Sequence, residues 1–166
     1  DPEVLATLPP LVLASTGMDA LTHAYETFVS TLTNPISQAL AYDSMRLIGK
    51  YLRALYANPD NREAQGHMML ASTMAGMAFF NGRLGMVHAL AHPLGGVFDT
   101  PHGMANAILL PHCMDFSRMA APGLFARIAE ALGKDIQGLT VEEASRKAAE
   151  AVREILVDTR IPTSLR

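Results

Sequence analysis

Helix start and stop signals recur along the whole 166-residue sequence. Residues that favour helix starts precede segments in which apolar side chains return every three or four positions, the spacing of one helix face. No stretch alternates apolar and polar residues for long enough to predict a β-strand. The pattern predicts an all-α helical bundle. Because no repeat, linker or low-complexity segment interrupts it, we expect one domain over residues 1–166.

Local residues also predict where the individual helices begin and end. Pro93 and the Gly95-Gly96 pair predict the end of a short helix and a turn of the chain after it. Pro111 predicts a kink or a break in the next helix, from about Gly103 to Met114. The other predicted boundaries are a first helix capped by Ser15 or Thr16, a second between Asn34-Pro35 and Asn58, a third capped by Asn61, one ending at Gly133, and one starting at a Thr140-Glu143 capping box.

The composition restricts which kinds of partner the chain is expected to bind and which cellular compartment it is expected to occupy. The chain carries a net charge of -3 with 17% charged residues and has no block of Lys or Arg, which argues against binding to nucleic acid. No apolar run reaches the ~18 residues of a membrane span. Cys113 is the single cysteine, so no disulfide can form within the chain and a cytoplasmic location is expected. The low charge predicts a face that another domain or a second copy covers, as in a homo-oligomer.

Asp19 and His23 are the first candidate pair for chemistry. They lie four positions apart on a predicted helix, so their side chains share one face and are close enough to bind one metal ion. An ordinary ion pair on a helix surface is the alternative interpretation. The neighbours Met18 and Leu21 favour burial, and a buried carboxylate requires a partner.

His88 and His92 repeat this spacing between apolar neighbours, and His102 follows after a turn. These histidines are either metal ligands or core residues whose ring nitrogens bond to the backbone. His67 and His112 are weaker candidates. A site of one carboxylate and several imidazoles suits Fe(II), Zn(II), Co(II) or Mn(II). The glycines at positions 82, 85, 95 and 96 do not form the dinucleotide-binding GxGxxG pattern.

Five segments together carry a family resemblance. They are STGMDALTHA at 15–24, AGMAFFN at 75–81, GMVHALAHPLGG at 85–96, TPHGMANA at 100–107 and LPH at 110–112, followed by Met114. In these motifs the sequence resembles the iron-containing (group III) alcohol dehydrogenase family. The resemblance covers most of residues 8–118. It implies the helical C-terminal domain of a two-domain, dehydroquinate synthase-like fold, without the N-terminal nucleotide-binding domain and the last helices.

The resemblance also implies roles for particular residues. The disturbance at Pro93 would let the chain fold back and bring His102 to the metal. His92 would sit beside the metal, near nicotinamide and substrate, as a catalytic residue that relays the hydroxyl proton. Phe79 would line the substrate pocket. The implied metal ligands are Asp19, His23, His88 and His102.

The activity that the resemblance implies is NAD(P)-dependent interconversion of a primary or secondary alcohol with its aldehyde or ketone. The implied cofactors are Fe(II), with Zn(II) as the alternative, and NAD or NADP. Because the nucleotide-binding part is missing from this sequence, we expect the chain alone to be inactive. Two alternatives remain: a non-redox metal-binding or interaction module on the same fold, and a plain helical bundle whose histidines only pack.

Overall fold

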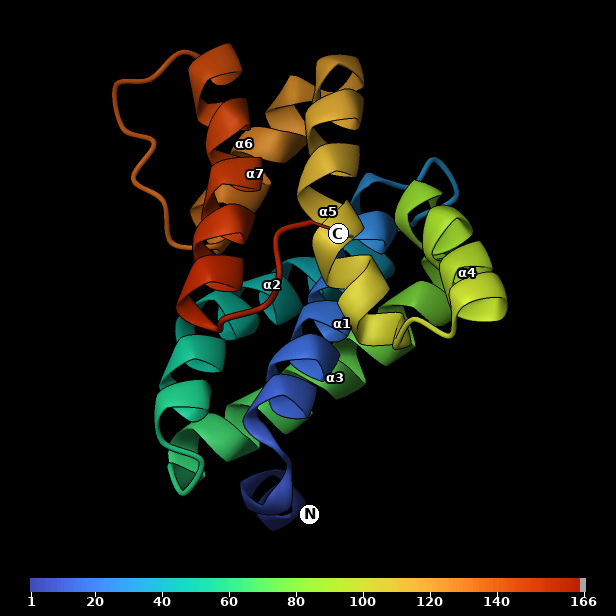
Figure 1. Cartoon of the computed structure of the whole chain (residues 1–166). Coiled ribbons are helices and arrows are strands. Elements are labelled where there is room, and N and C mark those ends of the chain that lie inside the picture. Colours follow the sequence, from blue (N-terminus) through green and yellow to red (C-terminus); the bar gives the residue numbers. More distant parts are fainter. Residues whose placement is uncertain (165–166) are drawn as a thin grey trace.

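The computed structural model describes residues 1–164 and contains no strand in that part of the chain (Figure 1). This confirms the all-α prediction. None of the described helices combines the length and the apolar character needed to cross a membrane. In chain order the elements are η1 (Pro2–Thr7), α1 (Pro10–Val29), α2 (Pro35–Ala57), α3 (Arg62–Gly82), α4 (Met86–Phe98), α5 (His102–Ser117), η2 (Arg118–Ala120), α6 (Pro122–Ala131) and α7 (Val141–Asp158).

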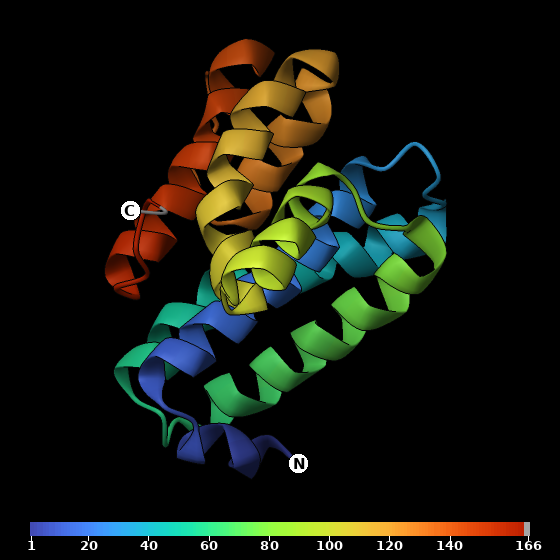
Figure 2. The same cartoon turned by 45° about the vertical axis from the view of Figure 1, so that its right-hand side comes forward.

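The helices form two groups that meet along α1 and α2. Helices α2 and α3 pack along each other, and both pack against α1. Helices α6 and α7 form a second pair, and α5 connects this pair to α1 (Figure 2). The short helix α4 lies at the side of the molecule and packs mainly on α5. The N-terminal half of α5 therefore lies between α1 and α4.

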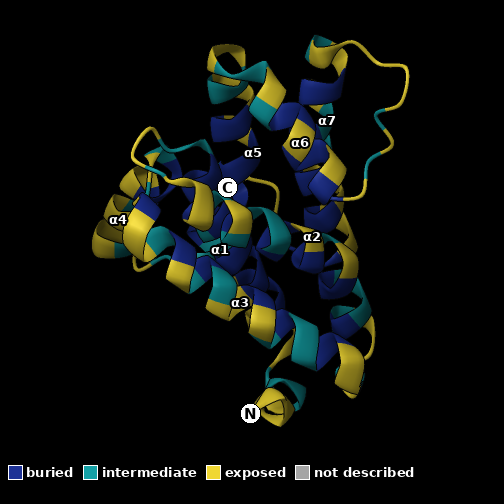
Figure 3. Ribbon diagram, turned by 180° about the vertical axis from the view of Figure 1, so that it is seen from behind, coloured by how far each residue is buried: buried dark blue, intermediate teal, exposed yellow. Residues whose placement is uncertain are grey.

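One apolar core runs through both groups. Buried faces line the inner sides of the helices and exposed residues lie outside (Figure 3). Each large side chain that is fully buried contributes roughly 1.5–3 kcal/mol to folding. The largest of them are Phe28, Phe125, Met18, Leu21, Met45, Ile48, Leu52, Leu55, Leu110, Met114, Ile128 and Ile155.

Capping residues explain the predicted starts of three helices. The Asn34 side chain accepts hydrogen bonds of 3.0 Å from the backbone N–H groups of Ile36 and Ser37, so α2 begins as predicted. Asn61 accepts from a backbone N–H in the first turn of α3. The capping box of Thr140 and Glu143 is present at the start of α7. Each cap satisfies backbone donors that a helix start leaves unpaired.

The first helix begins five positions earlier than the predicted Ser15 cap. Pro10 occupies the first turn of α1, where its fixed φ and missing N–H fit. The hydroxyl groups of Ser15 and Thr16 donate back to the carbonyl oxygen of Val12, at 3.1 and 2.9 Å. Both residues lie inside the helix, so the prediction that one of them caps it is wrong.

Helix α4 continues through Pro93 and the Gly95-Gly96 pair to Phe98, so the predicted helix end and turn are wrong. The chain reverses at Asp99, whose φ of 54° is left-handed and whose N–H donates to the carbonyl oxygen of Gly95. The carbonyl that would have bonded to a donor at Pro93 belongs to Ala89, an exposed residue. Helix α5 likewise continues through Pro111.

Candidate metal centre

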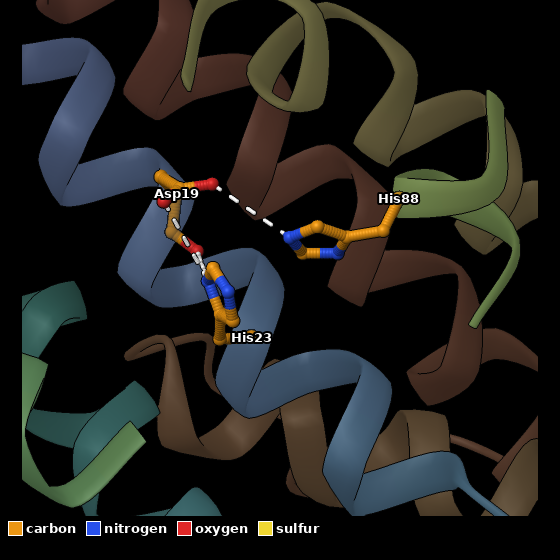
Figure 4. Close-up of side chains that lie close together, drawn as sticks. All are labelled: Asp19, His23 and His88. Atoms are coloured by element: carbon orange, nitrogen blue, oxygen red, sulfur yellow. Dashed lines mark hydrogen bonds and ion pairs between the residues drawn. The ribbon is translucent and has the colours of Figure 1, made fainter. Parts of the chain in front are cut away.

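Asp19, His23 and His88 converge on one point. The first two lie one turn apart on α1, and His88 reaches toward them from α4 (Figure 4). One ligand atom from each lies within 4.8 Å of the other two. The Asp19 carboxylate is 3.7 Å from His23 Nδ1 and 3.8 Å from His88 Nε2. The structure thus brings together three of the four predicted ligands.

His102 approaches the same carboxylate from the start of α5. Its Nε2 lies 3.4 Å from Asp19 Oδ1, although His102 is not part of the tight group of three. The His102 side chain is 45% exposed, whereas that of His88 is 2% exposed, so His102 lies on the solvent side of the cluster. The reversal at Asp99, and not a break at Pro93, brings His102 back to α1.

His92 and Phe79 lie at the edge of this cluster. The exposed His92 ring stacks on His102 with a centroid distance of 5.5 Å, and it is 5.8 Å from His88. Phe79 on α3 places its ring 4.6 Å from His23. The two weaker candidates lie apart from the cluster: His67 stacks on Tyr51 and His112 is exposed.

Asn106 on α5 lies among the predicted ligands, and the sequence interpretation missed it. Its amide nitrogen Nδ2 is 2.6 Å from Asp19 Oδ1, 3.1 Å from His88 Nε2 and 3.0 Å from His102 Nε2. Its Oδ1 is buried and has no hydrogen-bond partner among residues 1–164. The available signal was its position four residues after His102, on the same face of one helix.

Glu26 on α1 is the second residue that the interpretation missed. Its side chain is 2% exposed, and its Oε2 lies 2.7 Å from His88 Nδ1. Positions 19, 23 and 26 have the i, i+4, i+7 spacing of one helix face, which was the available signal.

The chemistry of these residues fits a divalent metal ion. Burial lowers the pKa of His23 below its ordinary value, although a hydrogen bond to the Asp19 carbonyl opposes the shift. The shift favours the neutral imidazole, the form that binds metals. Asp19 Oδ1, His88 Nε2 and His102 Nε2 all lie within 3.1 Å of Asn106 Nδ2. Carboxylate and imidazole atoms that converge in this way are ligands of the type that Fe(II) and Zn(II) accept.

Known proteins are similar to this chain in both sequence and fold. The C-terminal model of the Fe-containing alcohol dehydrogenase family matches residues 13–166. The 1,3-propanediol dehydrogenase of Klebsiella pneumoniae is 46% identical over all 166 residues, which correspond to 43% of its own length. The NAD-dependent methanol dehydrogenase of Bacillus methanolicus is 39% identical over 98% of this chain and 43% of its own length.

A crystal structure of 1,3-propanediol oxidoreductase superimposes on the whole chain with a TM-score of 0.98 and 46% identity, and 44% of that chain is covered. The chain therefore spans less than half the length of these relatives. The family match begins inside α1, at residue 13, and covers every later helix up to α7. This chain belongs to the iron-containing alcohol dehydrogenase family.

Proposed function

We propose that this chain is the metal- and substrate-binding domain of an NAD(P)-dependent alcohol dehydrogenase. The observation that carries the proposal is the convergence of the Asp19 carboxylate with imidazoles from three segments of the chain. The proposed ligands are Asp19, His23, His88 and His102. The proposed metal is Fe(II), with Zn(II) as the alternative, because both accept a mixed set of imidazole and carboxylate ligands.

A metal ion at this point would act as a Lewis acid on the oxygen of a small alcohol or aldehyde. The residues around it would orient the substrate. The exposed imidazole of His92 lies beside His102 and His88, in a position to accept the hydroxyl proton as the alcohol is oxidised. The Phe79 ring, in contact with His23, would form an apolar wall for the carbon chain of the substrate.

Hydride transfer requires a nicotinamide cofactor, and we propose that residues outside this chain bind most of it. The name of the Bacillus methanolicus relative supports NAD as the cofactor, and NADP is the alternative. We expect the 166-residue chain alone to be inactive, and we expect the complete protein to be a cytoplasmic homo-oligomer. Exposed apolar side chains, such as Phe80 and Phe98 at 79% and 71% exposure, support a partner domain or a second copy.

A zinc titration of the 166-residue chain, in competition with a chromophoric chelator, tests the metal site. The wild-type chain is expected to bind one ion. Asp19→Asn is expected to lower the affinity at least about 100-fold, because losing an outer partner of a ligand already costs about 10–100-fold. The matched control is Asp115→Asn, which removes an exposed carboxylate paired with Arg153 on α7. Equal affinities of the Asp19 variant and the wild-type chain would refute the site.

The activity is tested in the full-length protein that contains this chain. With metal bound, it is expected to reduce NAD⁺ or NADP⁺ in the presence of small primary or secondary alcohols. A chelator should abolish this reaction, and Fe(II) added under anaerobic conditions should restore it. Zinc binding without reduction of either nucleotide would favour the alternative of a non-redox metal-binding module.

A further inference from the structure

The buried carboxylate of Glu26 accepts hydrogen bonds from three donors on the segment that carries His88. The backbone N–H groups of Gly85 and Val87 donate to it at 2.8 and 2.5 Å, and the third partner is His88 Nδ1 at 2.7 Å. A carboxylate with 2% exposure requires such partners, because burying an unpaired charge costs several kcal/mol. All three partners lie at the start of α4.

These contacts cap α4 from a different helix. The residue before α4 is Gly85, which offers no side-chain cap. The N–H group of Gly85 itself and that of Val87, the second residue of the helix, donate to Glu26 instead. The negative carboxylate also interacts favourably with the positive end of the helix dipole. A Cβ atom at position 85 would lie 3.1 Å from Glu26 Oε1, which explains why glycine permits this close approach.

The same carboxylate determines which nitrogen of His88 carries the proton. An ionised carboxylate only accepts hydrogen bonds, so the short contact to Glu26 places the hydrogen on Nδ1 of His88. A neutral imidazole with its hydrogen on Nδ1 has a lone pair on Nε2. In this structure His88 Nε2 lies 3.1 Å from Asn106 Nδ2 and 3.8 Å from the Asp19 carboxylate, on the side of the cluster. The lone pair therefore lies where a metal ion would need it.

We propose that Glu26 is a positioning residue of the metal centre. It fixes both the ring orientation and the proton position of His88, and it holds the start of α4 against α1, so that His88 Nε2 is directed at the point shared with Asp19 and His23. This inference rests on the ligand assignment in the proposed function. It assigns to Glu26 a role beyond that of a helix cap.

Glu26→Gln separates the two roles. Glutamine keeps the size of the side chain and one oxygen that can accept from the backbone. Its amide group, however, can donate to His88 Nδ1 and so move the imidazole hydrogen to Nε2, where it blocks the lone pair. Zinc affinity, measured by chelator competition, is expected to fall about 10–100-fold. In the metal-free chain, long-range ¹H–¹⁵N spectra of His88 are expected to change from the Nδ1–H to the Nε2–H pattern.

Two further variants complete the test. Glu26→Asp keeps the charge and is expected to retain the Nδ1–H form and to bind zinc more tightly than Glu26→Gln. Glu63→Gln makes the same chemical change on α3, where the carboxylate accepts from the Tyr51 hydroxyl, and should leave zinc affinity unchanged.

Different outcomes overturn different statements. A wild-type chain that binds no zinc overturns the ligand assignment itself. Zinc binding by the wild-type chain and equally tight binding by Glu26→Gln overturn only the role of Glu26. Equal losses in the Asp and Gln variants, or a loss of affinity without a change in the His88 spectrum, would assign the effect to packing and would also overturn the inference.

Discussion

Two regions of the molecule bury different kinds of side chain. The α6–α7 pair buries apolar residues, whereas the region where α1, α4 and α5 meet also buries polar ones. Between α6 and α7 the interior contains small and aliphatic residues such as Ala148, Ile128 and Ile155. Where α1, α4 and α5 meet, Glu26, His88 and Asn106 are buried. Apolar side chains need only similar volume and periodicity, whereas buried polar atoms need partners at defined distances. The first region can therefore be built by local rules, and the second requires particular contacts between distant segments.

Charge pairs show the same contrast. On α7 the carboxylates of Glu150 and Glu154 pair with Lys134, and they are 45% and 48% exposed. Exposed pairs of this kind contribute roughly 0–1 kcal/mol each. The pair of Glu26 and His88 is 2% exposed on both sides, so removing either partner would leave the other buried without it. Loss of an ion pair at the surface of α7 should therefore change the stability little, whereas the buried pair fixes the positions of the Glu26 and His88 side chains.

The largest expected effect on stability is in the apolar region. Ile155→Ala removes a side chain that is 1% exposed on α7, and we expect it to lower the free energy of unfolding by about 2–5 kcal/mol. Zinc affinity, measured at a temperature where the variant is folded, should stay at the wild-type value. Urea denaturation and chelator competition give the two quantities. A parallel loss of zinc affinity would show that the two regions are energetically coupled and would break the comparison.

A smaller effect is expected at the start of α7. Thr140→Ala removes the hydroxyl that accepts from the backbone N–H of Glu143, which should cost about 1 kcal/mol of unfolding free energy. Urea denaturation measures the loss, and amide hydrogen exchange should increase in the first turn of α7. Thr73→Ala is the control, because this exposed threonine lies inside α3 and its hydroxyl donates to the Met69 carbonyl of its own helix. Equal effects of the two changes would contradict the capping role.

The all-α fold and the starts of α2, α3 and α7 could be predicted from local sequence, because those starts depend on local contacts. The Asn34, Asn61 and Thr140 caps each bond to backbone groups two or three positions away, so their effect does not depend on the rest of the molecule. Helix α4 differs, because its start is capped by Glu26 from another helix. Its path through Pro93 lies outside what local propensities predict.

The residues of the candidate site could be predicted only in part from sequence patterns. The spacing of Asp19 and His23 indicated a pair on one helix face, and the structure places His88 beside them. Spacing alone left His88 and His92 as an equivalent pair, and the resemblance separated their roles. Asn106 and Glu26 each share a helix face with predicted ligands, but their contacts span 87 and 62 positions, and spacing along one helix does not show which distant residue they meet.

The smallest predicted effect on the free energy of unfolding concerns Gly96, where the turn expected from the sequence differs from the helix in the structure. Two adjacent glycines favour a turn, yet the structure places Gly96 inside α4, where an added Cβ would point into open space in the described part of the chain. Gly96→Ala should therefore raise the free energy of unfolding by about 0.5–1 kcal/mol, because alanine loses less backbone entropy in a helix. Gly133 is the matched control: its φ of +87° makes alanine strained, so Gly133→Ala should destabilise. Urea denaturation measures both, and destabilisation by both changes would mean that the chain turns at Gly96 and that α4 ends before it.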